Sequence, residues 1–430
     1  MKYKFTFALL VVAGIILLSG CKSEEEIKGL AYDPPGATIT TDKPIFLQPK
    51  RTFYFSKSKL YVSNEFEGAR LNDLYLVNDS TYTAIIEPEN APINNSAWYT
   101  FKIWSVKPQD IYINLTYKDG THRYIPKISY DGSEWTSIDT TLIETDTSKT
   151  VAKVKLIISE DTLWFSSQEL ITSSIYDKWE RSISTYPFVS KKTIGLSSEG
   201  KPINALRISE SNNNQDYIVI IGRQHPPEVT GFFALKAFVE TITDRSETAV
   251  EFRKKFNALV IPPVNPDGID NGHWRHNFNG VDLNRDWVNF NQPEPRTVKD
   301  EIKKLVNGGG KIKFFIDFHS TQKDVFYSMT LKSLITDNYS DDEKRTTEEN
   351  HSLMTEWLAN LQNRLPDYPV NIIDTLSKSS SPTSDRWMQR EFNSPAITYE
   401  VGDETDRELI KKVAGVAVIE LMKLLLEGTN

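Results

Sequence analysis

The sequence predicts a mixed α/β domain, with a mainly parallel sheet sandwiched by helices, preceded by an all-β sandwich domain. From about residue 45 to residue 160, apolar and polar side chains alternate with a period of two between turn residues. After about residue 185, continuous apolar runs alternate with helical apolar stripes. The length of 430 residues is sufficient for two domains.

Composition and charge exclude several classes of protein. Apolar residues make up 39% and charged residues 25%, which excludes collagen, low-complexity disorder and a polytopic membrane protein. The net charge of −8 disfavours nucleic acid as a partner. A single cysteine excludes an intramolecular disulfide and a thiolate zinc cage. The ligands of any bound metal are therefore expected to be histidines and carboxylates.

The first residues have the pattern of a secretory signal. Lys2 and Lys4 precede a short apolar run from Phe5 to Leu18, which is too short to span a bilayer as a mature helix. The run Leu18-Ser19-Gly20-Cys21 resembles a bacterial lipobox. This resemblance implies that residues 1–20 are a signal peptide and that Cys21 carries the acyl chains that anchor the protein to a membrane.

Residues 21–44 are polar and contain proline, which is typical of a lipidated tether. Together with the lipobox, they predict a protein of the bacterial cell envelope, anchored to the outer membrane. The acidic run Glu24-Glu25-Glu26 resembles the surface-export tags of some bacterial lipoproteins. A solvated charge cluster explains the same residues, so surface exposure stays open.

Residues 45–160 are expected to form the β-sandwich. Thr52–Phe55, Thr100–Trp104 and Asp110–Tyr117 alternate in the manner of half-buried strands. Asp119-Gly120 and Asp131-Gly132 are strong turn signals. No catalytic motif is found here.

Residues 161–430 are expected to form the α/β domain, which begins with a connecting segment. Buried strands are predicted at 217–221, 256–261 and 314–318, and helices at 231–242, 354–365 and 410–426. Two histidines follow the predicted strands directly: His225 after the first and His319 at the end of the third. Binding sites form at such strand ends in open α/β sheets. Because Glu228 follows His225 by three residues, these side chains are candidates for a zinc site with one open position.

Six motifs in a fixed order make the prediction specific. They are His225-Pro-Pro-Glu228, Asn265–Gly268, Trp274-Arg275, Asp282–Trp287, Asp317–Ser320 and Thr398–Glu400. This order resembles the zinc metallocarboxypeptidases of the carboxypeptidase A/B superfamily, over roughly residues 190–425. Within the superfamily it is most similar to the cytosolic-carboxypeptidase-like branch, whose members carry a β-sandwich before the catalytic domain. The resemblance implies the zinc carboxypeptidase fold and one zinc ion per chain.

The resemblance also implies a role for each motif residue. His225, Glu228 and His319 are the expected zinc ligands, and Asp282 orients the ring of His225. Glu400 is the expected general base for a zinc-activated water, and Arg275 stabilises the oxyanion. Asn284 and Arg285 are expected to bind the terminal carboxylate of the substrate. Without the resemblance, Arg285 could equally form a structural ion pair with Asp282 or Asp286. His273 and His276 are expected at the pocket edge or the surface rather than as ligands.

Two features leave the substrate open. Pancreatic-type members have a tyrosine on a mobile loop before the catalytic glutamate, whereas this chain has Lys378–Ser381 in that stretch. One alignment places Asp385 in the specificity pocket and favours terminal Lys or Arg. Another alignment places Arg386 there and favours a carboxylate-bearing terminal residue, and the branch resemblance favours this second alternative.

The leading functional prediction is a zinc carboxypeptidase that hydrolyses the C-terminal peptide bond of peptides or proteins. An alternative on the same metal site is a carboxypeptidase or amidase of peptidoglycan stem peptides. A third is a non-catalytic lipoprotein that binds peptides or glycans through its sandwich, which the presence of a candidate for every catalytic role disfavours.

Overall fold

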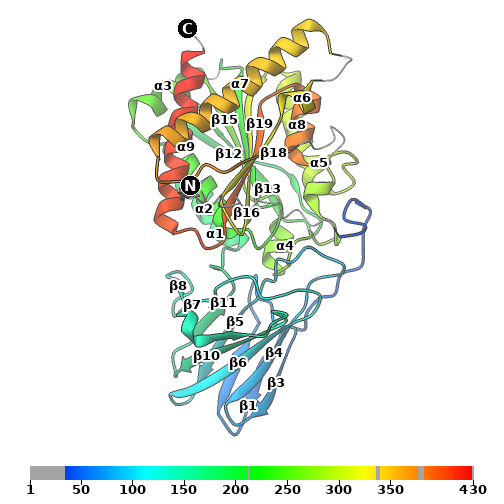
Figure 1. The fold of residues 1–430 in the computed structure, drawn as a ribbon, viewed down its shortest axis with the longest axis vertical. Coiled ribbons are helices and arrows are strands. Elements are labelled where there is room, and N and C mark those ends of the chain that lie inside the picture. Colours follow the sequence, from blue (N-terminus) through cyan, green and yellow to red (C-terminus); the bar gives the residue numbers. More distant parts are fainter. Residues whose placement is uncertain (1–33, 212, 336–338, 376–381, 429–430) are drawn as a thin grey trace, which may run out of the picture. The chain divides into compact units, whose positions relative to one another are not determined.

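The computed structural model describes residues 34–428, except 212, 336–338 and 376–381 (Figure 1). Cys21 and the predicted signal peptide lie outside the described residues. The described chain contains a β-sandwich followed by an α/β domain, and this confirms the predicted fold class. Among these residues no helix combines the length and the apolar character needed to cross a bilayer.

The sandwich consists of a six-stranded sheet and a five-stranded sheet. The first has the order β1-β2-β5-β11-β7-β8 and the second the order β3-β4-β6-β10-β9. The strands are β1 (Thr52–Phe55), β2 (Leu60–Ser63), β3 (Asp73–Asn78), β4 (Thr81–Ile86), β5 (Thr100–Ser105), β6 (Gln109–Tyr117), β7 (Lys127–Ser129), β8 (Thr136–Ser137), β9 (Ile143–Thr145), β10 (Val151–Ile158) and β11 (Leu163–Ser166), with a short helix η1 (Thr140–Leu142) before β9. Because β11 belongs to the six-stranded sheet, the sandwich extends past residue 160.

The alternating pattern explains how the sandwich forms its core. In β6 the side chains of Ile111, Ile113 and Leu115 are fully buried, while the residues between them are partly exposed. Strand β10 pairs with β6 and buries Ala152 and Val154 in the same core. Each sheet therefore has one apolar face, and the two faces bury one another.

The α/β domain has an eight-stranded sheet in the order β12-β13-β15-β14-β16-β19-β17-β18. Its strands are β12 (Val189–Leu196), β13 (Pro202–Ile208), β14 (Asp216–Gly222), β15 (Asn257–Ile261), β16 (Lys311–Thr321), β17 (Val325–Met329), β18 (Ile372–Thr375) and β19 (Ala396–Gly402). The central strands β15, β14, β16 and β19 are parallel, whereas β12, β13 and the β17–β19 pair introduce antiparallel contacts.

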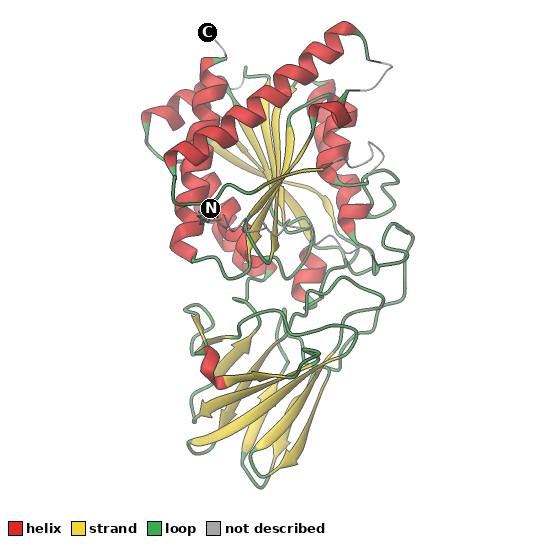
Figure 2. Cartoon of the chain, in the orientation of Figure 1, coloured by secondary structure: helices red, strands yellow, loops and turns green. Residues whose placement is uncertain are grey.

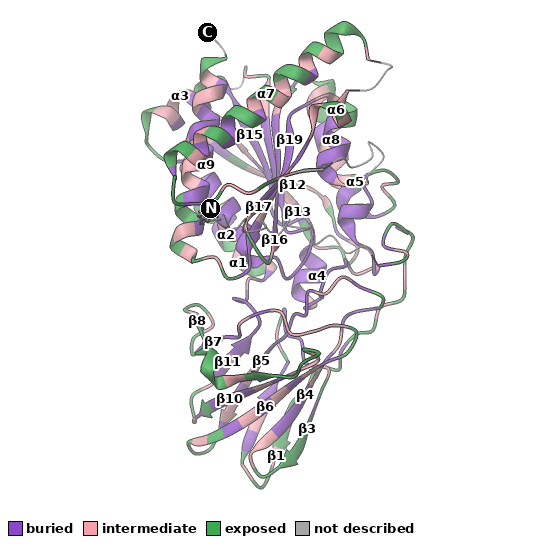
Figure 3. Cartoon of the chain, in the orientation of Figure 1, coloured by how far each residue is buried: buried purple, intermediate pink, exposed green. Residues whose placement is uncertain are grey.

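Helices cover both faces of this sheet (Figure 2). The helices are α1 (Ser173–Ile183), α2 (Val229–Ile242), α3 (Glu247–Lys255), α4 (Pro266–Asp270), η2 (Leu283–Arg285), α5 (Pro293–Asn307), α6 (Leu331–Leu334), α7 (Asp341–Arg364), α8 (Ser384–Phe392) and α9 (Arg407–Glu427). Ile218 and Ile220 of β14 pack in the core formed with α1, α2, α3, α7 and α9, whereas Val219 and Ile221 pack in the core formed with α5 and α8. The central strands are consequently buried on both faces (Figure 3).

Two segments differ from the sequence-based expectation. Helix α7 begins at Asp341, well before the predicted start at residue 354, because Ser340 and Glu343 form a capping box ahead of a polar first half. The end of the predicted tether is held against the α/β domain. Gln292 Nε2 donates to the Thr40 carbonyl at 2.8 Å, and the Lys43 N–H donates to the Asn279 carbonyl at 2.9 Å.

A buried ion pair joins the sandwich to the sheet of the α/β domain. Arg123 Nε donates to Asp403 Oδ2 at 2.8 Å, and Arg123 Nη2 donates to Oδ1 at 3.2 Å. The Arg123 side chain is 10% exposed and that of Asp403, just after β19, is 7% exposed. Removing one partner of such a pair leaves the other charge buried without compensation.

We predict that Arg123→Met lowers the free energy of unfolding by about 3–5 kcal/mol, measured by urea denaturation, since Asp403 loses its partner. Lys153→Met is the control, because Lys153 lies 3.9 Å from Glu144 and both side chains are exposed. The control is expected to change stability by less than about 1 kcal/mol. Equal effects of the two substitutions would contradict the prediction.

Candidate active site

The candidate site lies at the carboxyl ends of three neighbouring parallel strands. His225 follows the end of β14, and His319 lies near the end of β16. In the β16–β19 ladder His319 is directly opposite Glu400. Because parallel strands end at the same edge of a sheet, residues distant in the sequence meet there.

The loop after β14 is fixed by its own residues. Arg223 has a positive φ of 57°, and its guanidinium donates to the Pro226 carbonyl through Nε at 2.9 Å and Nη2 at 2.6 Å. Helix α2 then begins just after Glu228. A Cβ on Gly231 of α2 would lie only 2.6 Å from the His319 carbonyl oxygen. Glycine therefore allows the start of α2, and with it Glu228, to approach β16.

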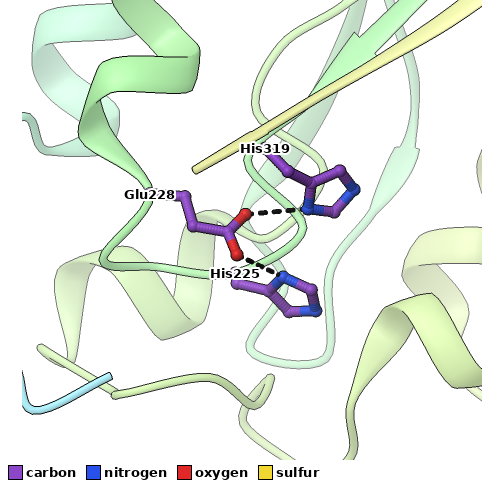
Figure 4. Close-up of side chains that lie close together, drawn as sticks. All are labelled: His225, Glu228 and His319. Atoms are coloured by element: carbon purple, nitrogen blue, oxygen red, sulfur yellow. Dashed lines mark hydrogen bonds and ion pairs between the residues drawn. The ribbon is translucent and has the colours of Figure 1, made fainter. Parts of the chain in front are cut away.

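His225, Glu228 and His319 form a buried cluster (Figure 4). His225 Nδ1 lies 2.8 Å from Glu228 Oε1, and His319 Nδ1 lies 2.8 Å from Glu228 Oε2. One ligand atom from each residue lies within 4.8 Å of the others. The two rings thus present their Nδ1 atoms to a common point beside the carboxylate.

The opposite edge of each ring faces a second carboxylate. His225 Nε2 lies 2.9 Å from Asp282 Oδ1, and His319 Nε2 lies 2.8 Å from Asp317 Oδ2. Asp317 is itself held by Gln224 Nε2 and Ser384 Oγ. Such outer partners fix the orientation and the tautomer of imidazoles that bind metals.

This donor set fits zinc. A neutral imidazole has one N–H, and the outer carboxylates take it at Nε2. The remaining lone pair on each Nδ1 then faces an oxygen of Glu228, which is unfavourable unless a cation or a further proton lies between them. Two imidazole nitrogens and one carboxylate are a common ligand set of catalytic zinc, which keeps its fourth position open. The cluster is therefore compatible with a zinc site.

Glu400 lies beside the cluster and is half-buried. Its Oε2 atom is buried and has no hydrogen-bond partner. Burial raises the pKa of Glu400 to about 7, with a further contribution from the negative charge of Glu228, although the nearby histidines oppose this. A carboxyl group with a pKa near neutrality and a free acceptor atom is suited to accept and release protons.

Arg275 and the Asn284-Arg285 pair lie near the same ligands. Arg275 Nε donates to Asp282 Oδ2 at 2.6 Å, and the Asn284 N–H donates to Asp282 Oδ1 at 2.9 Å. Asn284 Nδ2 lies 3.4 Å from His319 Nε2. Arg285 is 8% exposed and donates from Nη1 to the Asn284 carbonyl at 2.9 Å. Asp282 thus connects this segment to His225.

The two candidate specificity residues lie in the first turn of α8. The Ser384 N–H at its start donates to Asn284 Oδ1 at 3.0 Å, which brings α8 next to the site. Asp385 Oδ1 accepts a hydrogen bond from Thr383 Oγ1 at 2.6 Å. Arg386 lines a cavity of about 240 Å³ together with Arg390 and Met329. Asp385 does not line that cavity.

Several residues near the site were not found from the sequence. Asp317 could have been found, because it precedes His319 by two residues in a strand and therefore points to the same face. Tyr327 also lies on the face of Glu400, since it pairs with Thr398 in the ladder, and burial and Glu400 raise its pKa to about 12. Glu89 comes from the sandwich, and no local pattern points to it.

Two sequence-based expectations concern residues at the edge of the site. His273 and His276 are buried, with 0% and 5% exposure, so a surface position is wrong, whereas His276 lines a cavity together with Arg275 and Asp282, as expected of a pocket-edge residue. They are not part of the cluster that could hold a metal. Residues 376–381, which include the whole stretch Lys378–Ser381 found in place of the loop tyrosine, lie outside the described residues.

The comparison with known families decides the identity of the chain. The sequence profile of the zinc carboxypeptidase family matches residues 175–415. The chain belongs to this family. It is accordingly a metallocarboxypeptidase, a hydrolase of peptide bonds whose cofactor is zinc, and the His225–Glu228–His319 cluster lies within the matched residues.

Individual relatives agree with the family. Cytosolic carboxypeptidase 1 of Xenopus laevis is 33% identical over 129 residues, which cover 28% of this chain but only 10% of that protein. A metallo-carboxypeptidase from Burkholderia cenocepacia has a TM-score of 0.69 at 16% identity, covering 86% of this chain and 99% of its own. A metallo-carboxypeptidase from Pseudomonas aeruginosa has a TM-score of 0.67 at 17% identity, covering 85% of this chain and 98% of its own. These two structures share the fold.

We predict that His319→Ala abolishes stoichiometric zinc binding, because it removes one of three protein ligands. The zinc content of the purified protein is measured by elemental analysis. His351→Ala is the matched control, since His351 lies on α7 and outside the cluster, and this variant is expected to retain one zinc per chain. Retention of zinc by His319→Ala would place the site elsewhere.

Proposed function

We propose that the protein removes C-terminal residues from peptides, with Glu400 as general base and with His225, Glu228 and His319 as zinc ligands. The observation that carries this proposal is the buried, unpartnered Oε2 of Glu400 beside the paired Nδ1 atoms. Zinc, when bound, supplies a Lewis acid that polarises the scissile carbonyl and makes water more acidic.

The remaining steps belong to residues of the chain. Glu400 takes a proton from the attacking water at its carboxylate and later delivers it to the nitrogen of the leaving amine. The Arg275 guanidinium, oriented by Asp282, stabilises the negative charge that develops on the carbonyl oxygen. Asn284 and Arg285 bind the terminal carboxylate of the substrate, which an internal peptide bond does not have.

Substitutions of Glu400 and Arg285 are predicted to impair the enzyme in different ways. Glu400→Gln keeps the size of the side chain but cannot accept a proton, so kcat should fall by about a hundredfold or more while zinc stays bound. Arg285→Ala should lose a charge-assisted contact worth roughly 1.5–3 kcal/mol and with it much of the preference for a free C-terminus over an amidated one.

Both variants are measured on one peptide in its acid and amide forms. Glu400→Gln should slow both forms and keep the ratio between them, whereas Arg285→Ala should change the ratio. If Arg285→Ala discriminates between the two forms as strongly as the wild type, the proposed binding of the terminal carboxylate is wrong.

We also propose a preference for a carboxylate-bearing terminal residue, with Arg386 as its partner. Two observations support Arg386 over Asp385. Arg386 lines the 240 Å³ cavity beside a second arginine, Arg390. Asp385 is engaged by the Thr383 hydroxyl, and its Oδ2 lies 3.6 Å from Arg386 Nε. An acidic side chain that reached this cavity would meet Arg386 and Arg390, although the same contact places the charge of Asp385 beside Arg386.

Arg386→Ala is predicted to lower kcat/KM for a peptide ending in Glu by about tenfold to a hundredfold, with little change for the same peptide ending in Gln. Arg345→Ala on the exposed face of α7 is the control and should change neither value. A wild-type preference for terminal Lys or Arg, lost in Asp385→Asn, would instead support the alternative in which Asp385 determines specificity.

The stem-peptide alternative and the lipid anchor remain separate proposals. A panel of peptides with D-amino acid and isopeptide C-termini distinguishes a stem-peptide substrate from an ordinary peptide.

For the anchor, we propose acylation at Cys21 and attachment to the cell envelope. Cys21→Ala should then give an active enzyme that no longer partitions with membranes, and full membrane retention of this variant would refute the anchor.

A further inference from the structure

The loop that carries Arg275 is bound by the β-sandwich as well as by the catalytic domain. Its three residues Trp274, Arg275 and His276 donate their backbone N–H groups to a single carboxylate, that of Glu89. The distances are 2.7 Å from Trp274 to Oε2, and 3.0 Å and 2.7 Å from Arg275 and His276 to Oε1. Glu89 follows β4 of the sandwich and is fully buried.

The sandwich also holds the side chains on either side of Arg275. The Trp274 indole is fully buried in the sandwich core, and its Nε1 donates to the Trp98 carbonyl at 3.0 Å. A Cβ on Gly120 would lie 2.5 Å from this ring, so the glycine makes room for it. On the other side, His276 Nδ1 lies 2.7 Å from Asn90 Oδ1. The arginine is thus fixed between two anchors in the sandwich.

The guanidinium of Arg275 points away from these anchors, toward the metal cluster. Its Nε donates to Asp282 Oδ2, and Asp282 Oδ1 lies 2.9 Å from His225 Nε2. A continuous series of contacts therefore leads from Glu89 through the loop backbone and Arg275 to a candidate zinc ligand. We propose that Glu89 is a positioning residue through which the sandwich sets the place of the Arg275 guanidinium in the active site.

The charge of Glu89 is suited to this role. Burial would raise the pKa of its carboxyl, but attraction to His273, His276 and Arg70 and the N–H of Trp274 outweigh burial and lower the pKa to about 2. The carboxylate is therefore ionised, and a charged acceptor binds backbone N–H groups more strongly than a neutral one. Replacement of the carboxylate by an amide weakens all three hydrogen bonds together and places an N–H₂ group opposite N–H donors.

The inference about Glu89 rests on the proposed role of Arg275. A double-mutant cycle separates the role of Glu89 from that of Arg275. Zinc content, melting temperature, kcat and KM are measured on one peptide for Glu89→Gln, Arg275→Ala and the double variant. Glu89→Gln should lower kcat about tenfold or more with less than a threefold change in KM and full zinc content, because the guanidinium acts in the transition state. Arg275→Ala should lower kcat by about a hundredfold, and the double variant should be no slower than Arg275→Ala alone.

A purely structural role is tested by a matched control and a rescue variant. Glu169 is a buried acid of the segment after β11 whose Oε1 accepts from Arg407 Nε at 2.8 Å, and among the described residues no hydrogen bond or ion pair joins it to the Arg275 loop. Glu169→Gln should lower the melting temperature and leave kcat within about twofold of wild type. Glu89→Asp keeps the charge and should recover part of the lost kcat. If Glu89→Gln does not fold, Glu89→Asp, which keeps the charge but moves the carboxylate away from the three N–H groups, replaces it in the cycle with a smaller expected loss of kcat.

The outcomes are distinct. If Arg275→Ala has wild-type kcat, the proposed catalytic role of Arg275 fails. If Arg275→Ala is slow but the loss from Glu89→Gln adds fully to it in the double variant, Arg275 is catalytic and the inference about Glu89 is overturned. Wild-type kcat in Glu89→Gln overturns the inference as well.

Discussion

Two imidazole rings, each held between two buried carboxylates, are the arrangement on which the active site depends. Glu228 lies against the Nδ1 atoms of His225 and His319, while Asp282 and Asp317 lie against their Nε2 atoms. Three buried acids around two rings are costly without compensating positive charge, and Arg275 pairs with only one of them, Asp282. A zinc ion held by His225, Glu228 and His319 would supply further positive charge, which agrees with the membership of the chain in the zinc carboxypeptidases.

The two domains contribute to this arrangement unequally. The parallel strands β14, β16 and β19 of the catalytic domain bring the ligands and Glu400 to one edge of the sheet. The sandwich contributes no metal ligand among the described residues, yet its Glu89 binds the loop that presents Arg275. If Glu89 has the proposed positioning role, the sandwich contributes to catalysis through this loop, and Trp274 of the α/β domain is buried in the core of the sandwich.

The sequence predicts those parts of the site that are set by local pattern. His225 and His319 could be identified because each lies at the end of a continuous apolar strand, and Glu228 because its spacing from His225 brings both to one point. Glu89 could not be predicted, since it lies more than 180 residues from its partners and an acid at a strand end has no distinguishing pattern. The packing of Thr40 was missed for a related reason, because polar, proline-containing segments have the same composition whether or not a neighbouring domain binds them.

If zinc binds through the Nδ1 atoms of two histidines oriented by outer carboxylates, anomalous diffraction at the zinc absorption edge from crystals of the zinc-loaded protein should locate it there. We expect one strong peak per chain at about 2.0–2.2 Å from His225 Nδ1, His319 Nδ1 and a carboxylate oxygen of Glu228. A peak bonded to either Nε2 atom, or to a different set of residues, would contradict this expectation.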